Sequence, residues 1–445
     1  MLKGKRVAVL SILMFLLFVG GCSFDFVSVD NLMRAPKLTG IYGELEQAFE
    51  ASVGDAITLQ SPRSGSYRTA FVLHDIDGDF VDEALVFYTL NSDASTVHIH
   101  FLDYVNDTWI SAGDETGSER EIHELLFKDL DGDRTQEIIV NFSTKGGNKL
   151  MSVYGIDSRN AAVFSVAPLA TVQYQSYMMI DLDRDSTDEI FYTVFEVSAE
   201  SGVSVPYARV LKYSNGTDGP RMEPAVSLPL QSGISAFSAI TADFTERVSR
   251  VYLDCLYVNA DTMITEVIAW TPDSGYMLLM NKQDENAILK TSRPANLYTE
   301  DIDNDNMMEI PGEYELPCSE ILNVAEGMQY KSIGRNYYKL QSDGSMLLYK
   351  ADYADPAGRY LFDLLSIGYY GKICTVYDCL SESTAFYIYD SVNKKRAEHL
   401  FTLQLKVVNG DYTAYYDIGE VGAKNGFTPA LIGKSITILD TDVKE

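Results

Sequence analysis

Acidic side chains recur with one fixed spacing in four short segments of this 445-residue chain. In each segment, carboxylates stand at relative positions 1, 3, 5 and 9. The segments are loop 1 (Asp75, Asp77, Asp79 and Glu83), loop 2 (Asp129, Asp131, Asp133 and Glu137), loop 3 (Asp181, Asp183, Asp185 and Glu189) and loop 5 (Asp301, Asp303, Asp305 and Glu309). Carboxylates at alternate positions face one point when the chain curls, and Ca²⁺ prefers about six to eight such oxygen ligands. The spacing therefore predicts up to four structural calcium sites.

The residues between the carboxylates fit a tight metal-binding turn. Position 7 would offer its backbone carbonyl, whatever its side chain, and position 4 needs a residue that tolerates a sharp bend. Gly78, Gly132 and Asn304 meet that need at position 4. Arg184 in loop 3 departs from this pattern.

Three other interpretations fit the acidic loops less well. An EF-hand requires Gly at position 6, a bidentate acid at position 12 and flanking helices, and the loops lack all three. A carboxylate pair for glycoside hydrolysis flanks one scissile bond, whereas these acids repeat in every unit. Solvated acidic turns are the third interpretation, but neighbouring carboxylates repel one another unless a cation lies between them.

The spacing of the loops predicts a repeat. Loop 2 starts 54 residues after loop 1, loop 3 starts 52 residues after loop 2, and loop 5 starts 120 residues after loop 3. A degenerate copy, loop 4, lies midway and keeps Asp243 between Thr241 and Thr245, so we expect it to bind no metal. Five units of 52 to 60 residues, each with room for about four strands, predict a β-propeller of about five blades. A sixth blade is conceivable if the N-terminal region contributes strands, and a β-sandwich array is the rival.

Short runs rich in Val, Ile, Tyr, Phe and Thr predict strands on both sides of the loops. Ala70–Leu73 precedes loop 1, for example, and Ala84–Tyr88 follows it. Upstream, apolar residues at helical spacing predict one amphipathic helix over about 39–53, with its apolar stripe packed against the next domain. We therefore expect a mainly β protein in which residues 38–350 form this N-terminal helix and the propeller.

After the last acidic loop the pattern changes, and residues 352–445 predict a small β-rich (α+β) C-terminal domain. Phe401–Val407 alternates apolar and polar residues, and a turn at 409–411 leads into Tyr412–Ile418, which predicts a hairpin. Ala385–Tyr389 predicts another strand, and Leu431–Leu439 predicts a last one.

The first residues carry signals for export and lipidation. Lys3, Lys5 and Arg6 precede an apolar run over 7–19 that is too short to span a bilayer comfortably. The run ends in Val19–Cys22, which resembles a bacterial lipobox. We therefore expect residues 1–21 to be a signal peptide, Cys22 to be lipidated and residues 22–37 to be a tether. The mature protein would then be extracytoplasmic and lipid-anchored to a bacterial cell membrane.

The charge of the chain bears on its partners. The formal net charge is −29, and loss of the three cations of the signal peptide would bring it to −32 (−29 − 3). So acidic a chain disfavours nucleic acid, whose phosphates pair with Lys and Arg. Much of the acidity lies in the repeated loops, where bound cations would offset it.

Other side chains with reactive or ligating groups are few. Besides Cys22 the chain has four cysteines, which permits disulfides in an exported protein, with buried free thiols as the alternative. They are Cys255, Cys318, Cys374 and Cys379. His98 and His100 share one face of a strand and could bind a transition metal, although alternating polar residues on an exposed strand face are commoner.

The repeated loop carries a family resemblance. An Asp-x-Asp-Gly-Asp run with an acid at position 9, between two strands and repeated about every 50 to 60 residues, resembles the FG-GAP or VCBS repeat. That repeat is known from integrin α-subunit propellers and bacterial surface proteins. Over about residues 66–350 the resemblance implies an integrin α-like, calcium-binding propeller with ligands at positions 1, 3, 5 and 9. The Phe-Gly and Gly-Ala-Pro signatures themselves are not recognisable.

These features together predict a membrane-anchored, cell-surface lipoprotein that binds a protein or glycan partner through loops at one propeller face. The alternative is an exported hydrolase or lyase acting on cell-envelope polysaccharide or phosphoesters. The sequence contains no Gly-x-Ser-x-Gly elbow, phosphate loop or His-Glu-x-x-His motif, so it predicts no catalytic residue. A solute-binding lipoprotein, which uses two α/β lobes, conflicts with the repeats.

Overall fold

The computed structural model describes residues 40–144, 149–157, 163–217, 219–258, 261–280, 287–327, 330–408 and 411–439. The expected signal peptide, Cys22 and the expected tether lie outside the described residues. Within them strands predominate, so the prediction of a mainly β protein is confirmed. Among the helices in this part of the chain, none is long and apolar enough to cross a bilayer.

Each of the first four repeat units forms one antiparallel sheet. The first sheet contains β1 (Ile57–Leu59), β2 (Phe71–His74), β3 (Glu83–Leu90), β4 (Asp93–Val105) and β5 (Thr108–Thr116). The second contains β6 (Glu121–Lys128), β7 (Glu137–Ser143), β8 (Lys149–Asp157) and β9 (Ser165–Tyr174). The third contains β10 (Ser176–Ile180), β11 (Glu189–Val197), β12 (Ser204–Gly216) and β13 (Gly219–Pro229). The fourth contains β14 (Ile234–Phe244), β15 (Ser249–Tyr257), β16 (Thr262–Thr271), β17 (Gly275–Leu278) and β18 (Arg293–Pro294).

The last two sheets share the C-terminal part of the chain. The fifth sheet contains β19 (Glu309–Glu315), β21 (Ile333–Leu340), β22 (Met346–Ala354), β23 (Tyr360–Asp363) and β28 (Ile436–Ile438). The C-terminal sheet contains β20 (Glu320–Leu322), β24 (Ile373–Asp378), β25 (Ser383–Asp390), β26 (Lys395–Val408) and β27 (Asp411–Ile418). The expected boundary at residue 352 thus falls inside β22, and the two sheets exchange strands across it.

Few helices accompany the sheets in the described residues. They are α3 (Ile41–Val53), the short 3₁₀ helix η2 (Ile288–Thr291), α4 (Glu420–Lys424) and α5 (Pro429–Lys434). The predicted N-terminal helix is confirmed as α3. The predicted strand over 431–439 is wrong in its first half, because Pro429 and the Thr428 side chain, which accepts a hydrogen bond from the Leu431 amide, start a helix there. Only β28 remains extended.

The predicted C-terminal hairpin is also present. β26 pairs with β27 from Phe401↔Ile418 to Val408↔Asp411. The turn residues 409 and 410 lie outside the described part of the chain. Ala385–Tyr389, predicted as a strand, lies within β25.

Apolar cores lie between consecutive sheets. One core joins the first and second sheets through side chains such as Phe87 and Phe142, and another joins the second and third through Met151 and Tyr192. A third core extends from the third sheet through the fourth to the fifth. Each sheet therefore packs face to face with its neighbour in the chain. Successive side chains of a strand point to opposite faces of the sheet, and each face buries its row of apolar side chains.

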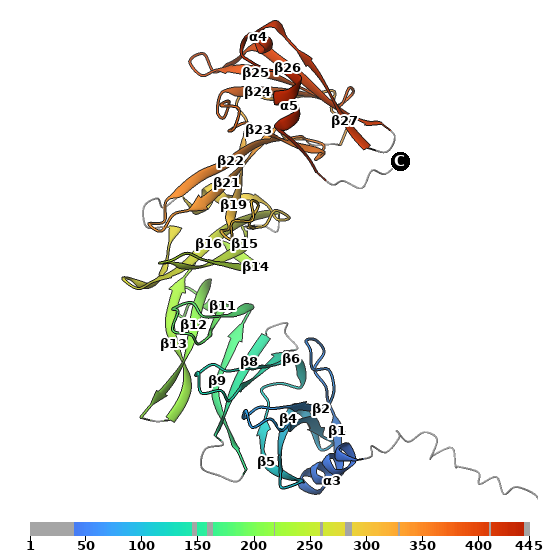
Figure 1. The fold of residues 1–445 in the computed structure, drawn as a ribbon, viewed down its shortest axis with the longest axis vertical. Helices are drawn as coiled ribbons and strands as arrows, with labels where there is room; N and C mark the ends of the chain where they lie inside the picture. Colours follow the sequence, from blue (N-terminus) through green and yellow to red (C-terminus); the bar gives the residue numbers. More distant parts are fainter. Residues whose placement is uncertain are drawn as a thin grey trace, which may run out of the picture.

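The sheets follow one another along the long axis of an elongated molecule (Figure 1). Helix α3 covers the outer face of the first sheet with Leu45 and Phe49. At the other end the C-terminal sheet shares a core with the fifth sheet. In the described residues no closed ring of sheets is detected, so the prediction of a β-propeller of about five blades is not confirmed. Both end faces that a ring would join are already covered.

Candidate metal centres

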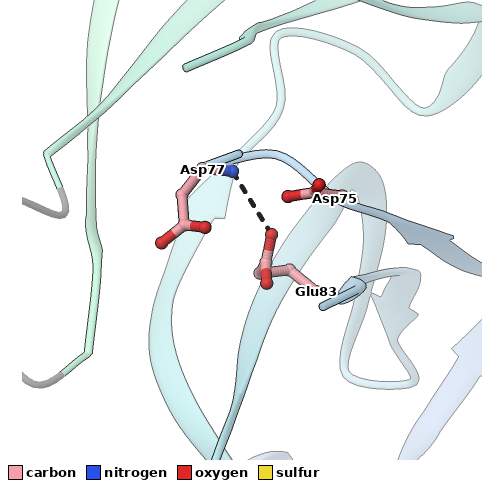
Figure 2. Close-up of side chains that lie close together, drawn as sticks. All are labelled: Asp75, Asp77 and Glu83. Atoms are coloured by element: carbon pink, nitrogen blue, oxygen red, sulfur yellow. Dashed lines mark hydrogen bonds between the residues drawn. The ribbon is translucent and has the colours of Figure 1, made fainter. Parts of the chain in front are cut away.

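The structure gathers three carboxylates in each of the four acidic loops. One oxygen from each of positions 1, 3 and 9 lies within 4.8 Å of the other two. The groups are Asp75, Asp77 and Glu83; Asp129, Asp131 and Glu137; Asp181, Asp183 and Glu189; and Asp301, Asp303 and Glu309. Figure 2 shows the first group at the turn between β2 and β3. The position-5 aspartates, which the sequence also predicts as ligands, lie outside these tightest groups.

The same hydrogen bonds shape every loop. The position-9 glutamate accepts the amide of position 2, as Glu83 Oε2 does from Ile76 at 2.7 Å. Equivalent bonds run from Leu130 to Glu137 at 2.7 Å, from Leu182 to Glu189 at 2.8 Å and from Ile302 to Glu309 at 2.9 Å. The carboxylate at position 1 accepts the amide of position 6, and that at position 5 accepts the amide of position 7 in all four loops. Because these bonds hold the carboxylates close together, the loops are preformed.

Two positions of each loop adopt left-handed backbone conformations. At position 4 the φ angles are 79° for Gly78, 79° for Gly132, 63° for Arg184 and 61° for Asn304. At position 6 they are 71° for Phe80, 79° for Arg134, 77° for Ser186 and 65° for Asn306. The sequence indicated the bend at position 4 but not the one at position 6, where only Asn306 is a residue that favours this region. Side chains there carry a conformational cost that the loop hydrogen bonds must offset.

Burial makes the position-9 glutamates the most perturbed acids of loops 1 and 2. Glu83 is 1% exposed and Glu137 is 2% exposed. Burial raises the pKa of Glu83 to about 8 and the pKa of Glu137 to about 8, despite the backbone hydrogen bonds that oppose the shift. In each of them Oε2 accepts a backbone amide. Among the described residues, neither glutamate forms an ion pair with a lysine or an arginine.

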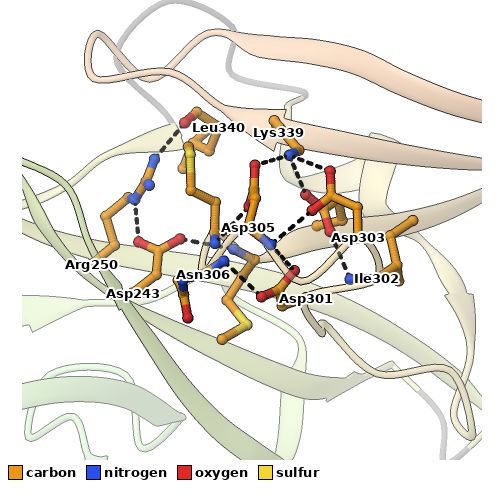
Figure 3. A network of polar contacts seen from close by, with 12 residues as sticks. Asp243, Arg250, Asp301, Ile302, Asp303, Asp305, Asn306, Lys339 and Leu340 are labelled. Atoms are coloured by element: carbon orange, nitrogen blue, oxygen red, sulfur yellow. Dashed lines mark hydrogen bonds and ion pairs between the residues drawn. The ribbon is translucent and has the colours of Figure 1, made fainter.

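Loops 3 and 5 differ because a lysine enters each cluster. Lys212 Nζ lies 2.6 Å from Asp185 Oδ2 and 3.2 Å from Glu189 Oε1, and it also pairs with Asp183. Lys339 Nζ lies 2.8 Å from Asp303 Oδ2 and 3.1 Å from Glu309 Oε1, and it also pairs with Asp305. Figure 3 shows Lys339 above the carboxylates of loop 5. Hydrogen bonds from Lys339 and Tyr349 hold the pKa of Asp303 at about 2.

In loop 4 the acid at ligand position 3 pairs with an arginine. Asp243 is 2% exposed and accepts Arg250 Nε at 2.6 Å, the Tyr252 hydroxyl at 2.9 Å and the Met308 amide at 2.9 Å. Arg250 also donates to the Leu340 carbonyl (Figure 3). The one acid that this degenerate copy keeps at a ligand position is therefore paired within the protein.

The loops contact one another at every step along the repeat. The Gln136 amide of loop 2 donates to the Ile76 carbonyl of loop 1 at 2.7 Å. Lys128, just before loop 2, pairs with Asp188 of loop 3 at 2.7 Å. Arg184 of loop 3 donates to carbonyls of loop 4, including Glu246 at 2.9 Å, and Asp243 of loop 4 accepts the Met308 amide of loop 5 at 2.9 Å. The loops thus form one continuous file along the stack of sheets.

The histidines and cysteines form no comparable centre. His98 Nδ1 and His100 Nδ1 lie 3.2 Å and 3.1 Å from the two oxygens of Asp114, which also accepts the Tyr88 hydroxyl at 2.7 Å. Among the described residues, only the four acidic loops group three potential ligands. Cys255, Cys318, Cys374 and Cys379 are free thiols, and burial together with the neighbouring Cys318 thiol raises the pKa of Cys374 to about 11.

The donor set of the loops decides which ions they fit. Every candidate side-chain ligand in the loops is a carboxylate oxygen, which suits hard cations such as Ca²⁺ and Mg²⁺ and disfavours ions that prefer nitrogen or sulfur. The chain matches no protein-family model and no curated protein. The case for function therefore depends on the geometry of the loops and the sheets that they connect.

Proposed function

We propose that this protein is an extracytoplasmic, lipid-anchored binding or scaffolding module whose repeated sheets are tied together by Ca²⁺. The observation that carries the proposal is the file of acidic loops. Four loops gather three carboxylates each, and consecutive loops touch at every junction between repeat units. A cation there would act on the relative orientation of the sheets, which is a structural role.

Calcium suits these loops better than magnesium. Mg²⁺ demands near-ideal octahedral geometry and retains several waters, whereas Ca²⁺ accepts irregular cages of carboxylate and backbone oxygens. The carboxylates of a loop are held by backbone hydrogen bonds and differ in burial. In loop 5 they range from the fully buried Glu309 to the exposed Asp303. The likeness to the FG-GAP or VCBS repeat supports the same ion, with the ligands Asp and Glu at positions 1, 3, 5 and 9.

The elongated shape supports a presenting role. Helix α3 lies at one end of the long axis, and α4 with β26 lies at the other (Figure 1). A lipid at Cys22 would place the membrane at the α3 end, so the C-terminal sheet would stand farthest from the membrane. There it could meet a protein or glycan of the cell envelope.

The anchor is tested by fractionation of bacteria that express the whole chain. We expect the unaltered protein in the membrane fraction and Cys22→Ala in the soluble extracytoplasmic fraction. Cys379→Ala, a change at a half-buried cysteine of the folded part, serves as the matched control and should stay with the membrane. A Cys22→Ala protein that remains membrane-bound would contradict the lipid anchor.

Binding and catalysis are separated by incubating the mature chain with purified cell-wall glycan and, in a second arm, with envelope proteins. Retention of either partner without release of glycan fragments or phosphate supports the binding module. Released fragments would instead support the hydrolase or lyase alternative. Retention of neither partner would contradict the proposal.

A further inference from the structure

The four acidic loops differ in the residue that stands opposite their position-9 glutamate on the next strand. Lys339 pairs with Glu309 in the register of β19 and β21. Lys212 follows Leu211, the partner of Ile190, and so stands opposite Glu189. In the same way, Gly155 follows Tyr154, the partner of Ile138, and so stands opposite Glu137. Asp103 follows Leu102, the partner of Ala84, and so stands opposite Glu83. One ladder position therefore carries a lysine in two units, a glycine in one and an acid in one.

The lysines take the place that a metal ion would take. Each ammonium lies within ion-pairing distance of the acids at positions 3, 5 and 9 of its loop. The side chain of Lys212 is 31% exposed and that of Lys339 is 12% exposed, so both charges are partly withdrawn from water. A Ca²⁺ ion would have to displace the ammonium or remain beside it against like-charge repulsion.

In loop 2 the position that a lysine occupies in loops 3 and 5 is open. A cavity of about 140 Å³ is lined by Asp131, Glu137, Gly155 and Tyr213. A Cβ atom added at Gly155 would lie 3.0 Å from Leu169 Cδ1, so the absence of a side chain at this position leaves the space free. Glu137, which is 2% exposed, and Asp131 thus both face this cavity.

Loop 1 is more acidic still. Asp103, which is 8% exposed, stands opposite Glu83 and accepts the Phe164 amide at 3.2 Å. It places a further negative charge beside Asp77 and Glu83. Among the described residues no cation is paired with the carboxylates of loop 1 or loop 2 at positions 1, 3 and 9.

We infer that the loops are divided into two kinds: loops 1 and 2 bind a divalent cation, whereas Lys212 and Lys339 serve as built-in counter-ions that keep it out of loops 3 and 5. The inference rests on the proposed calcium-binding role and narrows it from four ions to two. The ligand set remains beneath the lysine, because Asp181 Oδ1 and Asp183 Oδ1 of loop 3 are buried without a hydrogen-bond partner. Removing the ammonium should therefore restore a metal site.

The test counts the ions bound by the metal-stripped mature chain, with CaCl₂ as the only probe, by equilibrium dialysis and calorimetry. We expect two ions per chain. Asp77→Asn and Asp131→Asn should each lower the count by one, whereas Asp183→Asn and Asp303→Asn should leave it unchanged. Loss of an ion from either of the last two variants would overturn the division.

Gain of binding provides the converse test. Lys212→Met and Lys339→Met keep the length of the side chain and remove its charge, and each should raise the count from two to three. Lys406→Met, at an exposed lysine of β26, is the matched control and should leave the count at two. An unchanged count in both loop variants would show that the lysines do not exclude the ion.

The stoichiometry also separates this inference from the function on which it depends. Four ions bound by the unaltered chain would leave the calcium role intact and overturn the role of the lysines. No bound ion would overturn the calcium role and, with it, the division. Circular dichroism of each variant in excess CaCl₂ identifies any that fails to fold, and the asparagine and methionine series are independent of each other.

Discussion

Burial raises the pKa of every position-9 glutamate, and a nearby lysine opposes that shift in loops 3 and 5. Glu309 and Glu189 each have a lysine within 3.2 Å, while Glu83 and Glu137 have none among the described residues. Burying an unpaired carboxylate raises its pKa, because the low-dielectric interior disfavours the charged form. Glu266, which lies outside the loops and is 1% exposed, shows the same effect without any proposed metal.

Glu266→Gln should stabilise the protein at high pH and not at low pH. Burial raises the pKa of Glu266 to about 7 from an ordinary value of 4.5, although the Gln231 amide donates to it. The folded state therefore holds this proton more tightly than the unfolded state, and stability is lost as the pH rises from about 4.5 to about 7. A shift of this size corresponds to about 3 kcal/mol.

The measurement is the free energy of unfolding in urea as a function of pH. We expect the glutamine variant to exceed the unaltered chain by up to about 3 kcal/mol at pH values above the shifted pKa. The two should converge near the ordinary value of 4.5. A difference that does not change with pH would contradict the assignment.

Arg250→Met should be among the most damaging substitutions in the repeat. It would leave Asp243 buried without its guanidinium, and breaking a buried ion pair from one side costs about 3 to 5 kcal/mol. The double variant with Asp243→Asn removes both charges and should recover part of that loss. Urea unfolding of the two variants measures the difference, and a double variant no more stable than the single one would show that the charge pair is not the cause.

At the scale of elements, each loop both turns the chain and contacts the next repeat unit. Arg184 shows this most clearly. Its φ of 63° costs conformational energy, yet its guanidinium donates to Ser249 Oγ at 3.0 Å and to the Glu246 carbonyl at 2.9 Å in loop 4. The residue that departs from the turn pattern is thus the one that spans the junction between the third and fourth sheets.

Arg184→Gly separates these two effects. Glycine removes the strain of a left-handed residue, worth about 1 kcal/mol. It also removes the four hydrogen bonds that the exposed Arg184 guanidinium donates to residues 245–249, each worth about 0.5 to 1.5 kcal/mol. We expect a net destabilisation and faster hydrogen exchange in β14 and β15. Gly132→Ala, which adds left-handed strain without removing such bonds, is the comparison. An Arg184→Gly protein as stable as the unaltered chain would contradict the bridging role.

Sequence spacing could predict the loops but not everything that surrounds them. The acids at positions 1, 3 and 9 come together because their order in one short segment dictates it. The lysines could not be recognised from spacing, since Lys212 and Lys339 lie 23 and 30 residues beyond their glutamates (212 − 189 and 339 − 309). Their position depends on the register of the next hairpin. Arg184 likewise acts on a loop about 60 residues away, which no local pattern specifies.

At the scale of the whole molecule, the repeat predicts sheets that stack but not the angle between them. A ring closes only if the first sheet packs against the last. Here Leu45 and Phe49 of α3 cover the first sheet, and the C-terminal sheet covers the fifth. Such capping elements protect the ends of an open stack, as terminal repeats do in solenoid proteins. The helix was predictable from its apolar stripe, whereas its role as a cap was not.

Small-angle X-ray scattering distinguishes the open stack from a closed propeller. A compact chain of this length has a radius of gyration of about 22 Å. The arrangement in Figure 1 predicts a clearly larger value and a skewed distance distribution. A value near that of the compact chain would indicate that the sheets close on themselves in solution.

The measurement that most directly tests whether cations tie the repeat together is thermal unfolding of the mature chain in excess CaCl₂ and in excess EDTA, at matched ionic strength. A site filled at 100 times its dissociation constant adds about 2.7 kcal/mol to the free energy of unfolding, so calcium should raise the melting temperature by several degrees. The double variant Asp77→Asn/Asp131→Asn should lose most of this increase. Equal melting temperatures of the unaltered chain with calcium and with chelator would contradict the account.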